Sequence, residues 1–307
     1  MRIFLTGATG YVGRAVLDAL VKSGHQVTGL VRTHEGAAAV TAHGATPVIG
    51  NLFVPASYRA VAEAQDGYVH TALDSANPQL VDRMTVDVLL AAAKRPRTSG
   101  SPVAQRVVVY VSDVRVLGRV PDRVNEEAPV NPIPLVSWRP EHESRVLAAA
   151  DGNLRAIVVR PGVVYGRGEG VVGSMFRDAA NGLVRVVGDG NNRWPLIYDR
   201  DLADLVARLT AHKEATGIYH ANDEGDERVN DIVDAISPYL PMRPDVRHMP
   251  IHEARARLGA HADALALDQV VRSPRARALG WLPSLKSVAG NAARLLEEWR
   301  GATNRAA

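Results

Sequence analysis

Three glycines near the start of the chain stand at a spacing that is typical of phosphate binding. Gly7, Gly10 and Gly13 recur at every third residue in the segment Thr-Gly-Ala-Thr-Gly-Tyr-Val-Gly. Glycine lets the backbone turn tightly and approach a pyrophosphate, whose charge is bound by N–H groups at the start of a following helix. A Gly-rich turn that binds nothing is the alternative, so the flanking elements decide between the two.

The residues around the glycines predict the frame that a dinucleotide site needs. Residues 2–5 predict a short buried strand, and residues 15–21 have the periodicity of an amphipathic helix, which Gly24 would end. Residues 26–31 predict a second strand. A strand, a Gly-rich turn, a helix and a second strand within about 30 residues form the dinucleotide-binding context. We therefore expect this segment to bind a dinucleotide.

The end of the second strand favours NADP(H) over NAD(H). NAD-specific sites usually carry Asp or Glu there, which accepts a hydrogen bond from the ribose 2′-hydroxyl. Arg32 holds that position here, and a guanidinium pairs with a 2′-phosphate that a carboxylate would repel. Arg14 follows Gly13 and is a second candidate for the same phosphate. The alternative is that both are solvated surface arginines, since only four of the 36 Lys and Arg residues are Lys.

The composition excludes several classes of protein. Of 307 residues 46% are hydrophobic and 22% charged, which is ordinary for a globular protein. Cysteine is absent, which excludes disulfides and thiolate metal sites, and no metal site is predicted. A net charge of +3 with scattered basic residues predicts no nucleic-acid partner. No apolar run approaches the ~20 residues that span a bilayer, and the first strand leaves no room for a signal peptide, so we expect a cytoplasmic protein without a membrane partner.

Strand-like and helix-like segments alternate along the first half of the chain. Further strands are predicted at residues 45–49, 67–72, 106–111 and 154–160, with helices between them at 56–64, 80–93 and 138–150. This alternation is typical of an α/β fold with a Rossmann-like, doubly wound parallel sheet.

After Gly166 the pattern changes to shorter pieces punctuated by Gly and Pro. This change predicts a smaller C-terminal substrate-binding α/β domain. We assign residues 1–165, plus roughly 195–215, to the dinucleotide-binding domain, and residues 166–194 and 216–307 to the substrate-binding domain.

Six motifs in order make the chain similar to the extended short-chain dehydrogenases/reductases, the NAD-dependent epimerase/dehydratase group. They are Thr6-Gly-Ala-Thr-Gly-Tyr-Val-Gly13, Val48-Ile-Gly-Asn-Leu52, Val69-His-Thr-Ala72, Arg160-Pro-Gly-Val-Val-Tyr-Gly166, the segment from Asn192 to Asp201, and Leu279-Gly-Trp-Leu-Pro283. The resemblance covers nearly the whole chain. It implies the fold expected above and a nicotinamide dinucleotide as cofactor.

The chain departs from that family at the residues that carry its chemistry. Family members use Ser or Thr to polarise a carbonyl, Tyr to exchange a proton, and Lys to lower the pKa of that Tyr and hold the ribose. Aligning the motifs puts Asp113, Leu135 and Arg139 at these three positions. No tyrosine of this chain is followed four residues later by lysine, so the Tyr-x-x-x-Lys motif is absent in any register.

The candidate catalytic residues are Ser112, Asp113, Arg139 and Tyr165. Ser112 is a hydrogen-bond donor to a carbonyl or a strand-end cap, and Asp113 is a general base, a substrate anchor or a turn former. Arg139 can hold the nicotinamide ribose but cannot act as an acid near neutral pH. Tyr165 is expected to line the cleft, whereas His70 is expected to be a packed strand residue and not an acid.

The resemblance implies a set of residues that contact the cofactor. They come from the Gly-rich turn, the ends of the first strands, the start of the helix predicted at residues 138–150 and the segment after the sixth strand. These residues are Gly7, Thr9, Gly10, Tyr11, Val12, Gly13, Arg14, Arg32, Asn51, Leu52, Thr71, Ala72, Arg139, Pro161 and Val163.

An intact cofactor motif without the Tyr acid predicts a ketoreductase whose substrate helps to stabilise the alkoxide. Ketoreductases of aromatic, angucycline-type polyketide pathways that lack this Tyr are the nearest precedent. We therefore expect NADPH-dependent reduction of a ketone on a polycyclic aromatic secondary metabolite in antibiotic biosynthesis, by a monomer or homodimer. A non-catalytic NADP(H)-binding sensor and a nucleotide-sugar epimerase or dehydratase are the alternatives.

Overall fold

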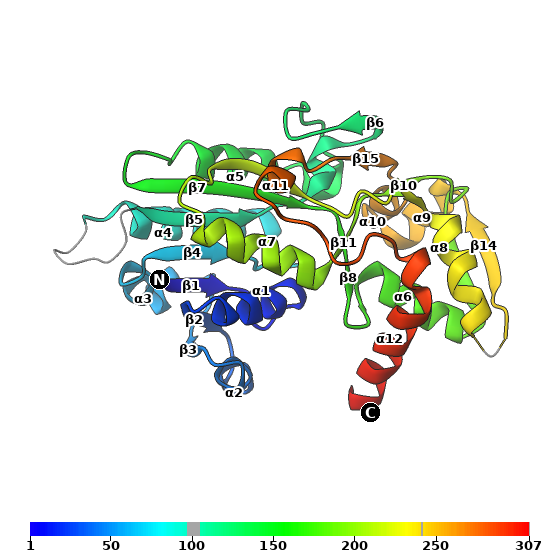
Figure 1. The fold of residues 1–307 in the computed structure, drawn as a ribbon, viewed down its shortest axis with the longest axis horizontal. Coiled ribbons are helices and arrows are strands. Elements are labelled where there is room, and N and C mark those ends of the chain that lie inside the picture. The colour runs from blue at the N-terminus through cyan, green and yellow to red at the C-terminus, as the bar shows by residue number, and fades with distance from the viewer. Residues whose placement is uncertain (97–104, 241, 307) are drawn as a thin grey trace. The chain divides into compact units, whose positions relative to one another are not determined.

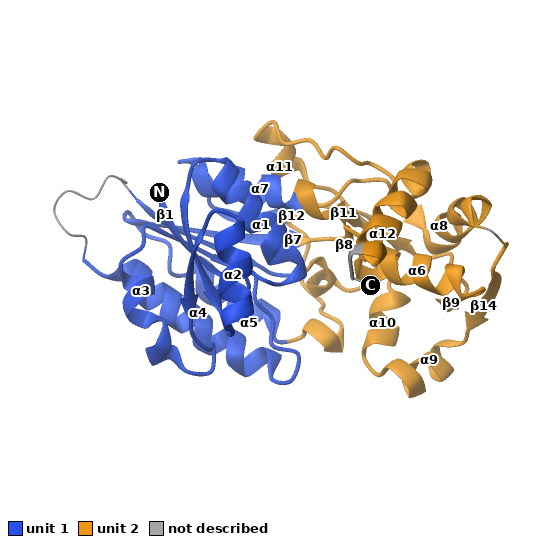
Figure 2. Ribbon diagram, turned by 90° about the horizontal axis from the view of Figure 1, so that it is seen from below, with its two compact units in different colours: residues 1–112, 138–160, 202–219 blue, residues 113–137, 161–201, 220–307 orange. Residues whose placement is uncertain are grey.

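The computed structural model describes residues 1–96, 105–240 and 242–306, and the chain folds into two compact units (Figure 2). Unit 1 comprises residues 1–112, 138–160 and 202–219, and unit 2 comprises residues 113–137, 161–201 and 220–307. The two units are therefore nearly equal in size, and the expectation of a smaller second domain is wrong. Residues 113–137, 161–165 and 195–201, which we assign to the first domain from the sequence, belong to unit 2.

Unit 1 is built from alternating strands and helices (Figure 1). Its strands are β1 (Arg2–Thr6), β2 (Gln26–Val31), β3 (Thr46–Ile49), β4 (Gly67–His70), β5 (Arg106–Val111), β7 (Leu154–Pro161) and β12 (Gly217–Ala221), the last two ending in unit 2. Its helices are α1 (Tyr11–Lys22), α2 (His34–Ala42), α3 (Arg59–Glu63), α4 (Pro78–Lys94), α5 (Arg139–Leu147) and α7 (Asp199–Ala211), whose first three residues belong to unit 2.

The seven strands form one sheet in the order β12-β7-β5-β4-β1-β2-β3. The pairs from β3 to β7 are all parallel, which confirms the doubly wound parallel sheet. The chain first moves outward from β1 through β2 to β3, and then returns to place β4 on the other side of β1. The strand order thus reverses between β1 and β4, and doubly wound sheets bind ligands at the carboxyl ends of the strands that flank such a reversal.

Helices cover both faces of the sheet. Phe4, Tyr68 and Val108 are paired across β1, β4 and β5, so their side chains share one face, where they pack against α3, α4 and α5. On the other side of the sheet α1 and α7 lie together (Figure 2). The inner strands β4, β5 and β7 are almost entirely buried because both of their faces are covered, whereas the edge strand β3 is partly exposed.

Unit 2 consists of short elements around a separate core. Its strands pair two by two: β6 (Val120–Val124) with β15 (Gln269–Val271), β8 (Val163–Gly166) with β11 (Leu196–Tyr198), β9 (Leu183–Val187) with β14 (Asp245–Met249), and β10 (Arg193–Trp194) with β13 (Glu227–Arg228). Its helices are α6 (Gly170–Ala180), α8 (Val229–Ile236), α9 (Ile251–Leu258), α10 (His261–Leu265), α11 (Pro274–Ala278) and α12 (Ala292–Ala306). Within the described residues, no helix has the length and apolar character needed to cross a membrane.

The pairing of β6 with β15 explains why residues 113–137 belong to unit 2. Val270 and Val271 lie opposite Arg123 and Val124, although about half of the chain separates the two strands. Gln269 also donates from its side chain to the carbonyl oxygens of Val114 (3.2 Å) and Gly118 (2.8 Å). The C-terminal part of the chain therefore holds this segment.

Candidate cofactor and active site

The turn between β1 and α1 has the close packing that only glycine permits. Gly7 adopts a φ of 78°, and a Cβ on Gly13 would lie 1.8 Å from the carbonyl oxygen of Gly7. The turn is closed by a hydrogen bond of 2.8 Å from the Gly10 N–H to the same oxygen. The second and third elements of the glycine motif therefore pack directly onto the first, as a tight phosphate-binding turn requires.

The start of α1 has features that suit an anion. Gly10 is its N-cap residue, no side chain caps the helix, and no acidic residue lies in its first turn. Gly10 and Thr9 are exposed, and the only atom near a Cβ on Gly10 would be the oxygen of Gly7 at 3.2 Å. The first turn of this 12-residue helix thus carries neither a side-chain cap nor an acidic residue of its own, which fits a pyrophosphate.

The neighbouring strands bring further predicted residues to the same edge of the sheet. Thr71 and Ala72 follow β4, and a Cβ on Gly7 would lie 2.7 Å from the Ala72 nitrogen, so the two loops touch. The Thr71 hydroxyl donates to the Thr6 carbonyl oxygen at 2.7 Å. Because β1, β2 and β4 are parallel neighbours, their carboxyl ends place these loops beside Arg32 at the end of β2.

Arg32 is exposed, and no acidic residue stands at the position where NAD-specific sites carry one. The next residue, Thr33, caps α2 by accepting a hydrogen bond from the Gly36 N–H at 3.1 Å. Asn51 follows β3 and uses its side-chain oxygen to accept from the Phe53 N–H at 3.0 Å, beside the half-buried Leu52. Arg32 is thus the charged side chain that this edge presents after β2.

Ser112 directly follows β5 and is part of a buried polar group with Glu143 and Arg160. Its hydroxyl donates to Glu143 Oε1 at 2.5 Å, and the Arg160 guanidinium donates to both oxygens of the same carboxylate, at 3.1, 3.1 and 2.6 Å. The three side chains are 2–5% exposed. The Ser112 proton therefore points at Glu143, and a carbonyl that used Ser112 would have to draw the hydroxyl away from it.

Arg139 lies at the start of α5, and its guanidinium reaches the end of β5. Its NH1 group donates to the Tyr110 hydroxyl at 3.2 Å and to the Val111 carbonyl oxygen at 3.3 Å. The guanidinium carbon lies 4.5 Å from the centre of the Trp138 ring. Arg139 is 8% exposed, yet its Nε has no hydrogen-bond partner in the described structure. A buried donor without a partner is expected where a ligand supplies the acceptor.

Four predicted site residues belong to unit 2. Asp113 caps the short helix at Val114–Leu117 by accepting from the Arg115 N–H at 2.9 Å, and its carboxylate pairs with the Arg115 guanidinium. This arrangement fits the turn-forming alternative for Asp113. Pro161 and Val163 lie at the end of β7 and the start of β8.

Tyr165 does not line a cleft, contrary to the prediction. Its side chain is fully buried in the core of unit 2 and packs on Tyr198 with the ring centres 5.7 Å apart. Burial raises the pKa of Tyr165 well above its ordinary value, and the nearby Asp223 raises it further. Tyr165 is thus unsuited to proton transfer near neutral pH.

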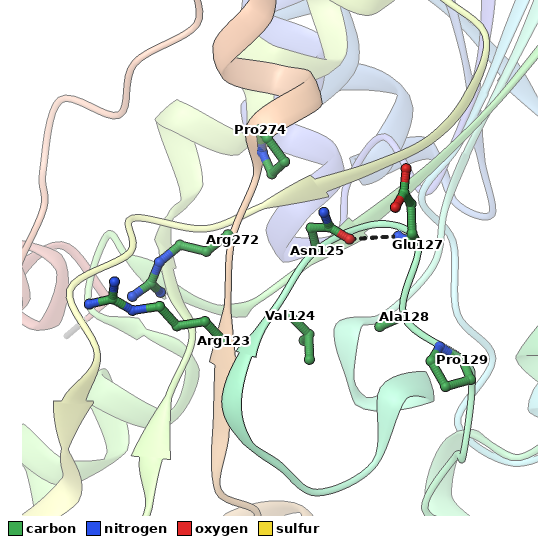
Figure 3. Close-up of a pocket in the computed structure, with 8 residues that line it drawn as sticks. All are labelled: Arg123, Val124, Asn125, Glu127, Ala128, Pro129, Arg272 and Pro274. Carbon is green, nitrogen blue, oxygen red and sulfur yellow. Dashed lines mark hydrogen bonds between the residues drawn. The ribbon is translucent and has the colours of Figure 1, made fainter.

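A solvent-open pocket of about 480 Å³ lies in unit 2 beside β6 and β15 (Figure 3). Its charged and polar lining residues are Arg123, Asn125, Glu127 and Arg272. The other four lining residues are apolar: Val124, Ala128, Pro129 and Pro274. The Arg272 guanidinium is paired with Asp226, at 2.8 Å between NH1 and Oδ1. None of the predicted site residues lines this pocket.

Sequence reasoning missed the buried partners that hold the site residues. Asp82, Tyr110, His142 and Arg160 were not predicted to have a role, although all four are at most 4% exposed. The available signal was polar residues within apolar periodic segments: Asp82 lies on the buried face of α4, and Tyr110 lies within an apolar strand. His70 is buried, as expected, and bonds to Thr6 and Asp82.

The chain is similar in sequence to several known proteins. An uncharacterized protein of Schizosaccharomyces pombe is 30% identical over 290 residues, which cover 92% of this chain and 95% of that protein. A 4-hydroxy-2-methyl-3-oxo-4-farnesyl-3,4-dihydroquinoline-1-oxide ketoreductase of Stigmatella aurantiaca is 35% identical over 177 residues, covering 54% of this chain and 51% of that one.

The fold is shared with solved structures. The crystal structure of the human epimerase family protein SDR39U1 with NADPH matches 97% of this chain and 99% of its own, with a TM-score of 0.77 at 20% identity. A model of the NAD dependent epimerase/dehydratase family matches residues 3–221, which include the Gly-rich turn, the sheet of unit 1 and the Val-Tyr-Gly motif. The chain therefore belongs to the NAD dependent epimerase/dehydratase family, whose members are NAD(P)-dependent epimerases, dehydratases and reductases.

Proposed function

We propose that the protein reduces a ketone on a polycyclic aromatic, polyketide-type metabolite with NADPH, without a tyrosine acid. The observation that carries this proposal is the tightly packed Gly-rich turn after β1 in a chain without a Tyr-x-x-x-Lys motif. Our alignment of the motifs puts Leu135 and Arg139 at the positions of the family's Tyr and Lys. The turn fits a dinucleotide. Neither Leu135 nor Arg139 can donate a proton near neutral pH, so another group must donate it.

The residues of unit 1 fit the two halves of NADPH. Gly7, Gly10 and Gly13 with the start of α1 would hold the pyrophosphate, and Arg32 would pair with the 2′-phosphate. Arg139 would hydrogen-bond the nicotinamide ribose through its unpartnered Nε. Bound NADPH supplies the hydride for the ketone carbon; what the protein must add is orientation and stabilisation of the carbonyl oxygen.

Ser112 is the residue of unit 1 best suited to stabilise that oxygen. Glu143 keeps the hydrogen bonds from Arg160 when the Ser112 hydroxyl turns away, so its buried charge stays compensated. To donate to a carbonyl, the hydroxyl would exchange its hydrogen bond to Glu143 for one to the ketone oxygen. A single donor of this kind contributes about tenfold to a thousandfold in kcat.

The substrate would supply the rest of the stabilisation. A hydroxyl next to the ketone on an aromatic ring already donates to the carbonyl oxygen, and the proton taken up by the alkoxide comes from that hydroxyl or from water. Asp113 is held by Arg115, which lessens repulsion between its carboxylate and a developing alkoxide. The Stigmatella aurantiaca relative is named for a ketone on a dihydroquinoline, in which the ring that carries the ketone is fused to a benzene ring, and this supports a bulky ring ketone as substrate.

The test is NADPH oxidation in the presence of hydroxyquinone ketones and, separately, nucleotide sugars. We expect turnover of the aromatic ketones only. Ser112→Ala should lower kcat by about tenfold to a thousandfold, whereas Asp113→Asn and the control Ser144→Ala, an exposed serine on α5, should retain most of it. Turnover of a nucleotide sugar would favour an epimerase or dehydratase instead.

A non-catalytic NADP(H)-binding protein is the second candidate. The observation that favours it is that the polar side chains at the end of β5 already have internal partners: Ser112 has Glu143, and Asp113 has Arg115. Tight NADPH binding with no turnover of any carbonyl compound would support this candidate and refute the ketoreductase.

A further inference from the structure

Asp82 is a buried carboxylate at the centre of a polar cluster inside unit 1. It lies on α4, is 4% exposed, and accepts hydrogen bonds from three side chains. His70 Nε2 lies 3.0 Å from Oδ1, while His142 Nδ1 and the Tyr110 hydroxyl lie 2.6 and 2.8 Å from Oδ2. These three residues and Asp82 are called the Asp82 cluster below.

The cluster keeps Asp82 ionised. Burial alone would raise the pKa of Asp82, but the adjacent His70 and the hydrogen bonds from His142 and His70 outweigh burial and hold the pKa below its usual range. A charged acceptor makes a stronger hydrogen bond than a neutral one, so the Tyr110 proton stays directed at Asp82.

This direction of the Tyr110 proton determines what Tyr110 can do for Arg139. A hydroxyl has one proton, and Tyr110 donates it in the hydrogen bond to Asp82. The Tyr110 oxygen can therefore only accept from Arg139 NH1, at 3.2 Å. The Val111 carbonyl oxygen accepts from the same NH1 group at 3.3 Å. One edge of the guanidinium is thereby held, while the buried Nε lacks a partner within the described structure.

We propose that the Asp82 cluster is a positioning device for the cofactor: through the Tyr110 hydroxyl it holds Arg139 so that its remaining donors face the nicotinamide ribose. This inference rests on the proposed binding of NADP(H), and it assigns Asp82 and Tyr110 as positioning residues that do not touch the cofactor. The alternative is that the cluster only fastens α4 and α5 to the sheet.

Binding of two ligands separates these alternatives. NADP+ carries the nicotinamide ribose, whereas adenosine 2′,5′-bisphosphate carries only the adenine half. Tyr110→Phe removes the hydroxyl and keeps the packed ring. We expect the Kd for NADP+, measured by titration calorimetry, to rise about fivefold to tenfold, the effect of one hydrogen bond, with no change for the bisphosphate. Asp82→Asn, which removes the charge, should likewise raise the ratio of the Kd for NADP+ to the Kd for the bisphosphate.

The matched control is Tyr68→Phe. Tyr68 is equally buried on the adjacent strand β4, and its hydroxyl donates to a backbone oxygen, that of Gln65, at 3.3 Å. This variant should leave both Kd values unchanged. A second control places Tyr110→Phe in an Arg139→Gln background, where it should have no further effect on NADP+ if Tyr110 acts through Arg139.

Three results would overturn the inference. The first is that Tyr110→Phe and Asp82→Asn weaken the binding of both ligands equally. The second is that these variants melt at a lower temperature while the ratio of the two Kd values is unchanged. The third is that Tyr110→Phe weakens NADP+ binding as much in the Arg139→Gln background as in the wild type. Failure of the wild-type protein to bind either ligand would refute the proposed function and this inference together, whereas binding of both with an unchanged ratio refutes the inference alone.

Discussion

Separate replacement of Gly10 and Gly13 should distinguish cofactor binding from folding. A Cβ on Gly13 would lie 1.8 Å from the Gly7 oxygen and 2.6 Å from the Gly7 carbonyl carbon, so Gly13→Ala must displace the turn. At Gly10 the nearest atom would be 3.2 Å away, and the φ of −77° suits any residue. Gly10→Val therefore adds volume where the pyrophosphate must approach, with little effect on the protein itself.

The two substitutions should also differ in how much each lowers the free energy of unfolding. Overpacking at Gly13 should cost about 1–3 kcal/mol or more, and a poorer N-cap at Gly10 should cost below about 1 kcal/mol. One kcal/mol corresponds to roughly 2–4 °C in melting temperature for a protein of about this size. For NADP+ binding, Gly10→Val should raise the Kd by at least about a hundredfold, because two or more hydrogen bonds to a charged group are lost.

The assays are thermal unfolding followed by circular dichroism and titration calorimetry with NADP+. Gly10→Val should melt within about 4 °C of the wild type and fail to bind, whereas Gly13→Ala should lose both stability and binding. If Gly10→Val bound NADP+ normally, the dinucleotide would not lie over this turn. If the two variants lost equal stability, the steric difference between the two positions would be refuted.

Two further predictions concern cofactor choice and pH. Arg32→Asp should weaken NADP+ by about tenfold to a hundredfold and leave NAD+ nearly unchanged, as calorimetry with both cofactors would show; the control is Arg59→Asp on α3, and equal wild-type affinity for the two cofactors would contradict the preference. Burial raises the pKa of Asp223 in unit 2 to about 8, and one of its carboxylate oxygens lacks a partner within the described structure. Between about pH 4 and 8 the folded chain therefore binds this proton more tightly than the unfolded chain does, so the free energy of unfolding should fall as pH rises, by up to about 1.4 kcal/mol per pH unit. Urea unfolding of Asp223→Asn at pH 5 and pH 8 should show a smaller fall than the wild type, and an equal fall would refute this interpretation.

The sequence predicts unit 1 well because its signals are local. The apolar strands, the helical periodicities and the glycine turn each lie within about ten residues, and the structure confirms strands at Arg2–Thr6, Gln26–Val31 and Arg106–Val111. The assignment of residues 113–137 fails because it depends on β6 pairing with β15, and no local pattern indicates a pairing between such distant segments.

The partners of the candidate side chains could not be predicted from the sequence either. Ser112 and Tyr165 were chosen for their residue type and motif position, but what each can do depends on its surroundings. The Ser112 hydroxyl is engaged by Glu143, 31 residues later, and Tyr165 is enclosed by core residues that extend to α12. Residue type indicates which chemistry is possible, and burial and partners, which are tertiary properties, decide whether the group is available.

Our alignment of the motifs puts Leu135 and Arg139 at the positions of the family's Tyr and Lys, and this pair of residues has a consistent physical explanation. In the family's Tyr and Lys pair, the lysine serves a tyrosine that exchanges a proton, so an amine with an adjustable pKa is useful. Leu135 has no proton to exchange, and a buried lysine beside it would tend to lose its charge. Arginine stays protonated when buried. Arg139 and Asp82 then lie on either side of the Tyr110 hydroxyl, and the guanidinium helps to keep the pKa of Asp82 below its usual range.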